Sequence, residues 1–173
     1  MYLLVVVEVF YVMAMCGLHS LTGEEEYKTE AVEMMERILS WSGDGAGELG
    51  RPQLSGDEGG SSLAVPMCLL SLLSMMRDLG WDKPGLEEAS VAEILSHVVR
   101  EGTTVLETVG PQGQELSGVA GRLVNPGHVI ECGWFLLQLA SRSAQSAQSD
   151  LAQTDFSAGI MTRVWPRHQS KHS

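Results

Sequence analysis

The fold is decided by the stretch Asn125-Pro126-Gly127-His128-Val129-Ile130-Glu131-Cys132-Gly133-Trp134-Phe135-Leu136-Leu137-Gln138-Leu139. Its first residue, Asn125, is of a type that caps free N–H groups at the start of a helix, and Pro126 suits the first helical turn. The apolar run that follows is long enough for about three turns. The stretch therefore predicts a helix that begins after Asn125 and runs through Leu139.

His128 and Glu131 fall in or near the first turn of this helix, and their spacing places both on one face. The positive end of a helix disfavours an added proton on a nearby imidazole, so we expect His128 to favour its neutral, proton-accepting form. A neutral histidine with a carboxylate one turn away is a candidate general base. The alternative is a structural pair behind a helix cap, since His-x-x-Glu is a weak pattern.

Apolar residues at helical spacing predict further helices over residues 8–21, 24–41, 63–79 and 86–99. The segment 42–62 is rich in Gly, Ser and Asp and is predicted to be a loop. Residues 102–121 are predicted to form a hairpin or extended excursion with a turn at 110–113. On the helix over 86–99, we expect His97 to be structural or solvent-facing.

A leucine repeat is present at Leu72, Leu79 and Leu86, which are seven residues apart. Gly80 and Pro84 interrupt it, and both residues break helices. Because a coiled-coil seam needs several unbroken repeats, we interpret these leucines as core residues, with a zipper-like contact as the alternative.

At 173 residues the chain is long enough for one domain with a buried core. Its formal net charge of -11 argues against nucleic acid and anionic membranes as partners, because both attract Lys and Arg. Cys16, Cys68 and Cys132 fit neither a disulfide framework nor the spacing of a metal site. We therefore expect reduced thiols in a cytoplasmic protein.

The first eighteen residues are strongly apolar. No Lys or Arg precedes them and Glu8 lies among them, which does not fit a signal peptide. The run is also barely long enough to span a bilayer. We expect a buried helix here, with a membrane anchor as the alternative.

Several sequence blocks occur in a fixed order between about residues 8 and 140. They are Phe10-Tyr11-Val12-Met13-Ala14-Met15, residues 27–36 (Tyr-Lys-Thr-Glu-Ala-Val-Glu-Met-Met-Glu), Gly50-Arg51-Pro52-Gln53-Leu54, Ala64-Val65-Pro66-Met67 and the central stretch from Asn125 to Leu137. Together they resemble the N-acylglucosamine 2-epimerase family, also called the renin-binding proteins. The resemblance ends near Phe156.

The resemblance implies an all-α fold, here a partial (α/α)6 barrel with a short β-hairpin insert, in a domain over residues 1–155. Residues 156–173 have no counterpart and are expected to form a disordered tail. The family chain is more than twice as long, so we expect an incomplete barrel that exposes apolar helix faces.

The resemblance also implies interconversion of N-acetylglucosamine and N-acetylmannosamine, by removal and return of the proton at C2. His128 matches one of the family's two acid/base histidines, and Glu131 is assigned to orienting it or to binding sugar hydroxyls. Arg51, Arg122 and Glu8 are assigned to substrate binding. For each arginine, a structural salt bridge is the alternative.

This chemistry requires no metal or redox cofactor, although the family is associated with ATP or related nucleotides as activators. The family's second histidine lies in a C-terminal region that this chain is expected to lack, so we expect the chain to be inactive alone. A homodimer or a complex with renin is implied as a partnership.

Two other functions stay open. One is a non-catalytic binding protein that associates with full-length epimerase or with renin. The other is a sister enzyme of the same fold, such as a cellobiose 2-epimerase or an aldose–ketose isomerase. The blocks at 27–36 and 50–54 favour the N-acyl enzyme over the sister enzymes.

Overall fold

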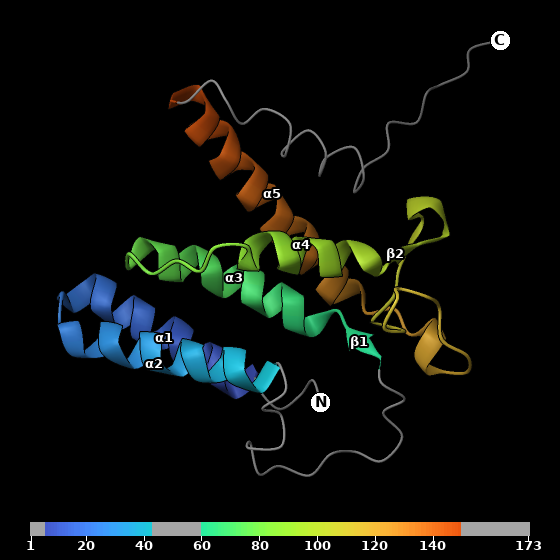
Figure 1. The fold of residues 1–173 in the computed structure, drawn as a ribbon, viewed down its shortest axis with the longest axis horizontal. Helices are drawn as coiled ribbons and strands as arrows, with labels where there is room; N and C mark the ends of the chain where they lie inside the picture. Colours follow the sequence, from blue (N-terminus) through green and yellow to red (C-terminus); the bar gives the residue numbers. More distant parts are fainter. Residues whose placement is uncertain (1–5, 43–59, 150–173) are drawn as a thin grey trace.

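The structure is a computed structural model that describes residues 6–42 and 60–149. Within these residues the chain folds into helices α1 to α5, two short 3-10 helices and two small antiparallel sheets (Figure 1). The predicted all-α class is confirmed. None of the described helices is long and apolar enough to cross a membrane.

Helices α1 (Val6–Thr22) and α2 (Glu25–Ser42) lie side by side as a helical hairpin (Figure 1). Gly23 ends α1 with φ +73, a left-handed conformation that glycine adopts without a steric penalty. Its N–H donates to the carbonyl of His19 at 2.8 Å. Both helices match their predicted ranges to within a few residues.

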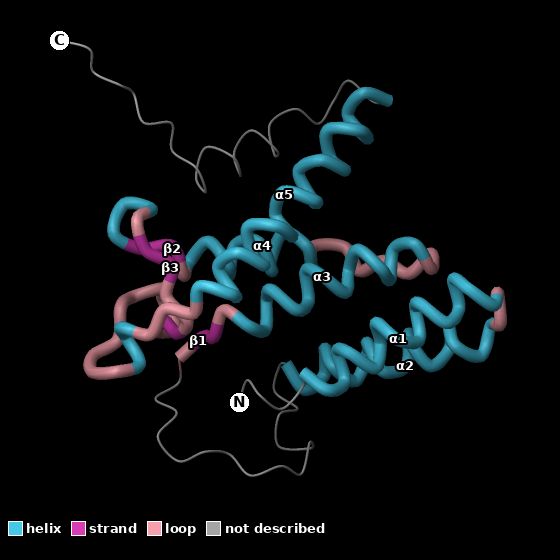
Figure 2. The backbone as a smooth tube through the Cα atoms, turned by 180° about the vertical axis from the view of Figure 1, so that it is seen from behind, coloured by secondary structure: helices cyan, strands magenta, loops and turns pink. Residues whose placement is uncertain are grey.

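Helix α3 (Ala64–Asp78) occupies the centre of the fold, because it packs against α1 and α2 on one side and against α4 and α5 on the other (Figure 2). Its buried residues are accordingly divided between two hydrophobic clusters. The cluster with α1 and α2 takes Leu69, Leu72, Leu73 and Met76 from α3, and the cluster with α4 and α5 takes Met67 and Leu70. An apolar helix with two packed sides explains why its sequence is apolar nearly all round.

The leucine repeat is part of this core. Leu72 is fully buried and Leu79 nearly so, both in the cluster with α1 and α2. Helix α3 ends at Asp78, before the repeat reaches Leu86. The core interpretation is therefore confirmed.

Helix α4 (Leu86–Ser96) ends before the predicted boundary at residue 99. Val98 and Val99 instead form strand β2, which pairs antiparallel with β3 (Thr104–Val105). These β-branched residues favour an extended backbone over a helical one. The intervening 3-10 helix η2 (Arg100–Gly102) reverses the chain through left-handed φ angles at Arg100, Glu101 and Gly102.

Of the two alternatives predicted for residues 102–121, the extended excursion agrees with the structure, whereas a hairpin formed within that segment does not. Strand β3 pairs with β2, which precedes that segment, and β4 (Thr108–Val109) pairs with β1 (Ser61–Ser62). Ser61 and Ser62 lie in the segment 42–62, which its Gly, Ser and Asp content predicts to be a loop. Long-range pairing with β4 makes them a strand instead. The predicted turn at 110–113 is confirmed by the hydrogen bond from Gly113 N to Gly110 O, at 2.8 Å.

Helix α5 (Pro126–Ser149) follows the 3-10 helix η3 (Ala120–Arg122). It begins where predicted and continues past Leu139, because the Ala-, Gln- and Ser-containing segment after it holds no Gly or Pro to break the helix. Its C-terminal half projects beyond the other helices (Figures 1 and 2).

A first test concerns the central position of α3. Leu72→Ala removes a fully buried side chain from the cluster with α1 and α2, and we expect it to lower the free energy of unfolding by roughly 2–5 kcal/mol. Leu21→Ala, at an exposed position near the end of α1, is the matched control and should change it by less than about 0.5 kcal/mol. Urea unfolding followed by circular dichroism measures both; equal losses would contradict the packing.

Candidate active site at the start of helix α5

The start of α5 is fixed by a side-chain cap. The Oδ1 atom of Asn125 accepts hydrogen bonds from the backbone N–H groups of Gly127, at 3.1 Å, and His128, at 3.4 Å. These groups have no partner within the helix, so the cap stabilises its first turn. The predicted helix start is confirmed, and it places His128 in that first turn.

The imidazole of His128 contacts a carboxylate from another part of the chain. Its Nδ1 atom lies 3.0 Å from Oε1 and 2.9 Å from Oε2 of Glu107, in the link between β3 and β4. The Glu107 side chain is 13% exposed and that of His128 is 31% exposed, so the pair lies at the edge of the interior. A base held by an orienting carboxylate is the usual arrangement of a proton-transfer site.

Sequence reasoning missed Glu107. No local sequence pattern predicts a contact between residues 107 and 128, because the contact depends on how β3, β4 and α5 pack in the folded chain. The one available signal was an acidic residue inside the extended segment predicted to precede the central helix.

Glu131 lies on the solvent-exposed side of α5. The carboxylate hydrogen-bonded to His128 is that of Glu107, not that of Glu131. The charge of Glu131 is nevertheless close enough to raise the pKa values of Cys68 and Cys132. Its assignment to sugar hydroxyls stays a prediction.

The other assigned residues are spread over the chain. Glu8 lies half-buried in the first turn of α1, a helix that packs against α2 and α3. Arg122 is exposed in η3, a few residues before the cap of α5. Arg51 lies outside the described residues. The substrate-binding role of all three stays a prediction.

The free thiols beside the site are protonated at neutral pH. Burial, followed by the charges of Glu107 and Glu131, raises the pKa of Cys132 to about 12. Burial, followed by the charge of Glu131, raises that of Cys68 to about 11. Because a thiolate is the reactive form of cysteine, neither residue is suited to act as a nucleophile here. No three described His, Cys, Asp or Glu residues are placed to hold a metal ion.

A second histidine, His97, is fully buried and structural. Its Nδ1 atom donates to the carbonyl of Leu106 at 2.8 Å, and its Nε2 atom lies 3.3 Å from Oγ of Ser61. Burial lowers the pKa of His97, which keeps the ring neutral. His97 therefore joins the end of α4 to the two small sheets. Of the two alternatives predicted for it, a structural role and a solvent-facing position, the structural role agrees with this contact.

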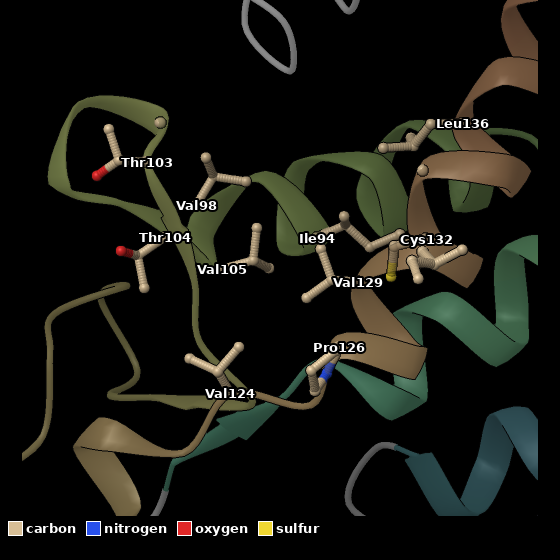
Figure 3. A pocket seen from close by; sticks show the side chains of 13 residues that line it. Ile94, Val98, Thr103, Thr104, Val105, Val124, Pro126, Val129, Cys132 and Leu136 are labelled. Carbon is tan, nitrogen blue, oxygen red and sulfur yellow. The ribbon is translucent and has the colours of Figure 1, made fainter.

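A pocket of about 550 Å³ lies between the start of α5, the end of α4 and the β2–β3 hairpin (Figure 3). Its wall is mainly apolar, and His128 is not part of it. The side chains shown in Figure 3 include Ile94, Val98, Val105, Val124, Val129 and Leu136. A sugar needs several convergent hydrogen-bonding groups, and the side-chain hydroxyls of this wall are those of Thr103 and Thr104.

Comparison with known proteins identifies close relatives. The chain is 47% identical over 139 residues to the N-acylglucosamine 2-epimerase of Mus musculus, covering 78% of this chain and 33% of the relative. It is 47% identical over 135 residues to the enzyme of that name from Homo sapiens, covering 76% of this chain and 32% of the relative. With the Bos taurus enzyme the identity is 45% over 137 residues, or 77% of this chain and 32% of the relative.

The chain thus spans about a third of the length of these curated relatives. No family model matches the chain. The matched part covers most of the chain, and the blocks around Asn125 and His128 that carried the resemblance fold into a capped helix start with a largely buried carboxylate against the histidine. The chain belongs to the N-acylglucosamine 2-epimerase family.

Proposed function

We propose that this chain serves the interconversion of N-acetylglucosamine and N-acetylmannosamine, with His128 as a proton-transfer group at C2 of the sugar. The observation that carries the proposal is the Glu107–His128 pair at the capped start of α5, in a chain that is 47% identical to curated N-acylglucosamine 2-epimerases. We further propose that the helix pairs around α3 are a section of an (α/α)6 barrel.

The reaction inverts the carbon that bears the acylamino group. In the open form of the sugar, the C2 proton is acidic because the aldehyde at C1 accepts the electron pair of the C–H bond as an enolate. His128 takes that proton, and the electron pair moves onto the C1 oxygen. Inversion then requires an acid that returns a proton to C2 from the opposite face.

The described residues offer His128 for one face. One group alone can remove the proton and return a solvent deuteron on the same side, which exchanges the C2 hydrogen without inverting the carbon. Without a second transfer group, the full epimerisation is expected to be slower by about a hundredfold or more. Exchange at C2 is therefore the reaction by which this chain is best tested.

The test is incorporation of solvent deuterium at C2 of N-acetylmannosamine, followed by proton NMR. We expect exchange with the native chain and a rate at least about a hundredfold lower with His128→Ala, because general bases contribute that much. His19→Ala, which changes a histidine near the end of α1, is the matched control and should exchange like the native chain. Equal rates for the native and His128→Ala chains would contradict the proposal.

A second candidate function, as a binding protein, is supported by the outer face of α5. Ile130, Trp134 and Leu137 follow one another at helical spacing and are 72%, 55% and 55% exposed. We call them the α5 stripe. Exposed apolar stripes of this kind usually mark a contact surface. Because the matched part of the chain covers only 33% and 32% of these two curated relatives, a full-length family member is the partner that offers further helices to cover it.

The binding candidate predicts a defined complex with full-length N-acylglucosamine 2-epimerase on gel filtration. Trp134→Ser should weaken the complex at least about tenfold, because a buried aromatic side chain often dominates an interface. Val119→Ser changes an apolar residue outside the stripe that is 85% exposed, and should leave the complex intact. Absence of a complex, or equal effects of both substitutions, would exclude this role for the stripe.

A further inference from the structure

We propose that Glu107 is the positioning residue for His128. Its carboxylate holds the imidazole in the form that carries hydrogen on Nδ1, and so leaves the lone pair on Nε2. That this arrangement promotes catalysis rests on the proposed function. That Glu107 determines which nitrogen of the ring carries the hydrogen does not.

The backbone of Glu107 is held on both sides. Its N–H donates to the carbonyl of Leu123 at 2.8 Å, and its carbonyl accepts from the N–H of Leu63 at 2.9 Å. The preceding residue, Leu106, exchanges hydrogen bonds with His97, so Glu107 follows directly on the β2–β3 pairing and precedes the β1–β4 pairing. Because these hydrogen bonds fix the backbone of Glu107, the position from which its side chain extends toward His128 is well defined.

The carboxylate is also well placed to select one form of the ring. Both oxygens lie within 3.0 Å of Nδ1, and an ionised carboxylate can accept but not donate a hydrogen bond. Nδ1 must therefore carry the hydrogen. In a neutral imidazole the other nitrogen is then the acceptor, so the bond to Glu107 assigns the basic lone pair to Nε2.

The same bond fixes how the ring is turned. Rotating the imidazole by half a turn would replace Nδ1 by a carbon and lose the hydrogen bond to a largely buried carboxylate. The cap by Asn125 stabilises the first turn of α5 and thereby the backbone position of His128. Orientation and the site of the lone pair are thus set together, which is what an aspartate does for the histidine of a serine protease.

No other nearby carboxylate takes this part. Glu131 is on the same helix as His128 but is solvent-exposed, and its side chain makes no hydrogen bond to the ring. Glu93 accepts a hydrogen bond from Oγ of Ser61 at 2.6 Å. Among the described residues, Glu107 is the carboxylate in hydrogen-bond contact with His128.

The test measures directly which nitrogen of the His128 ring carries the hydrogen. Long-range proton–nitrogen NMR spectra of the chain labelled with 15N-histidine distinguish hydrogen on Nδ1 from hydrogen on Nε2, at about pH 8, where an unperturbed imidazole is neutral. The His128→Gln variant assigns the signal. We expect the Nδ1–H form to predominate in the native chain and to become the minor form in Glu107→Ala.

Two further variants sharpen the result. Glu107→Gln keeps the size of the side chain but can either accept or donate, so we expect a mixture of both ring forms; it replaces the alanine variant if that one does not fold. Glu131→Ala removes the neighbouring carboxylate and should leave the Nδ1–H form predominant. In the deuterium-exchange assay, Glu107→Gln should be slower by on the order of tenfold or more, because orientation is lost.

The proposal would be overturned if His128 of the native chain carried its hydrogen on Nε2. It would also be overturned if the proportion of the Nδ1–H form were unchanged in both Glu107 variants. The outcome is independent of the proposed function. A chain without C2 exchange but with an Nδ1–H ring that depends on Glu107 contradicts the activity and keeps the positioning role. C2 exchange that is lost in His128→Ala but unchanged in the Glu107 variants keeps the activity and contradicts the positioning role.

Discussion

Glu107 joins three separate parts of the chain, and the candidate site depends on it. Its backbone binds Leu63 just before α3 and Leu123 just before α5, while its carboxylate binds the ring of His128. A charge-assisted bond at a mostly buried carboxylate is stronger than one in water and costly to leave unmade. The strand pairings on either side of Glu107 thereby help to position the side chain of His128 on α5.

Helix α3 supplies the framework in which this contact forms. It shares one hydrophobic cluster with α1 and α2 and another with α4 and α5, so both halves of the described fold meet on it. The candidate site lies at the α5 side of this framework, while the α5 stripe faces away from it. Catalysis and binding, the two proposed functions, thus use different faces of one helix.

The helices and the start of α5 could be predicted from the sequence, because apolar spacing and capping act within a few residues of each other. The pairing of Ser61–Ser62 with β4 could not, since two serines carry no strand signal and their partner is distant in the chain. The same holds for the site. The motif predicts His128 as a candidate base with Glu131 one turn away. The carboxylate that contacts the ring is instead that of Glu107, which a tertiary contact brings there.

The most direct measurement is a double-mutant cycle on Glu107 and His128. The free energies of unfolding of the native chain, Glu107→Ala, His128→Ala and the double variant are obtained by urea titration at neutral pH. If the two side chains are joined as the structure has them, their coupling stabilises the fold by at least about 1 kcal/mol. A coupling near zero would mean that the carboxylate does not hold the ring, and would contradict the account of the site.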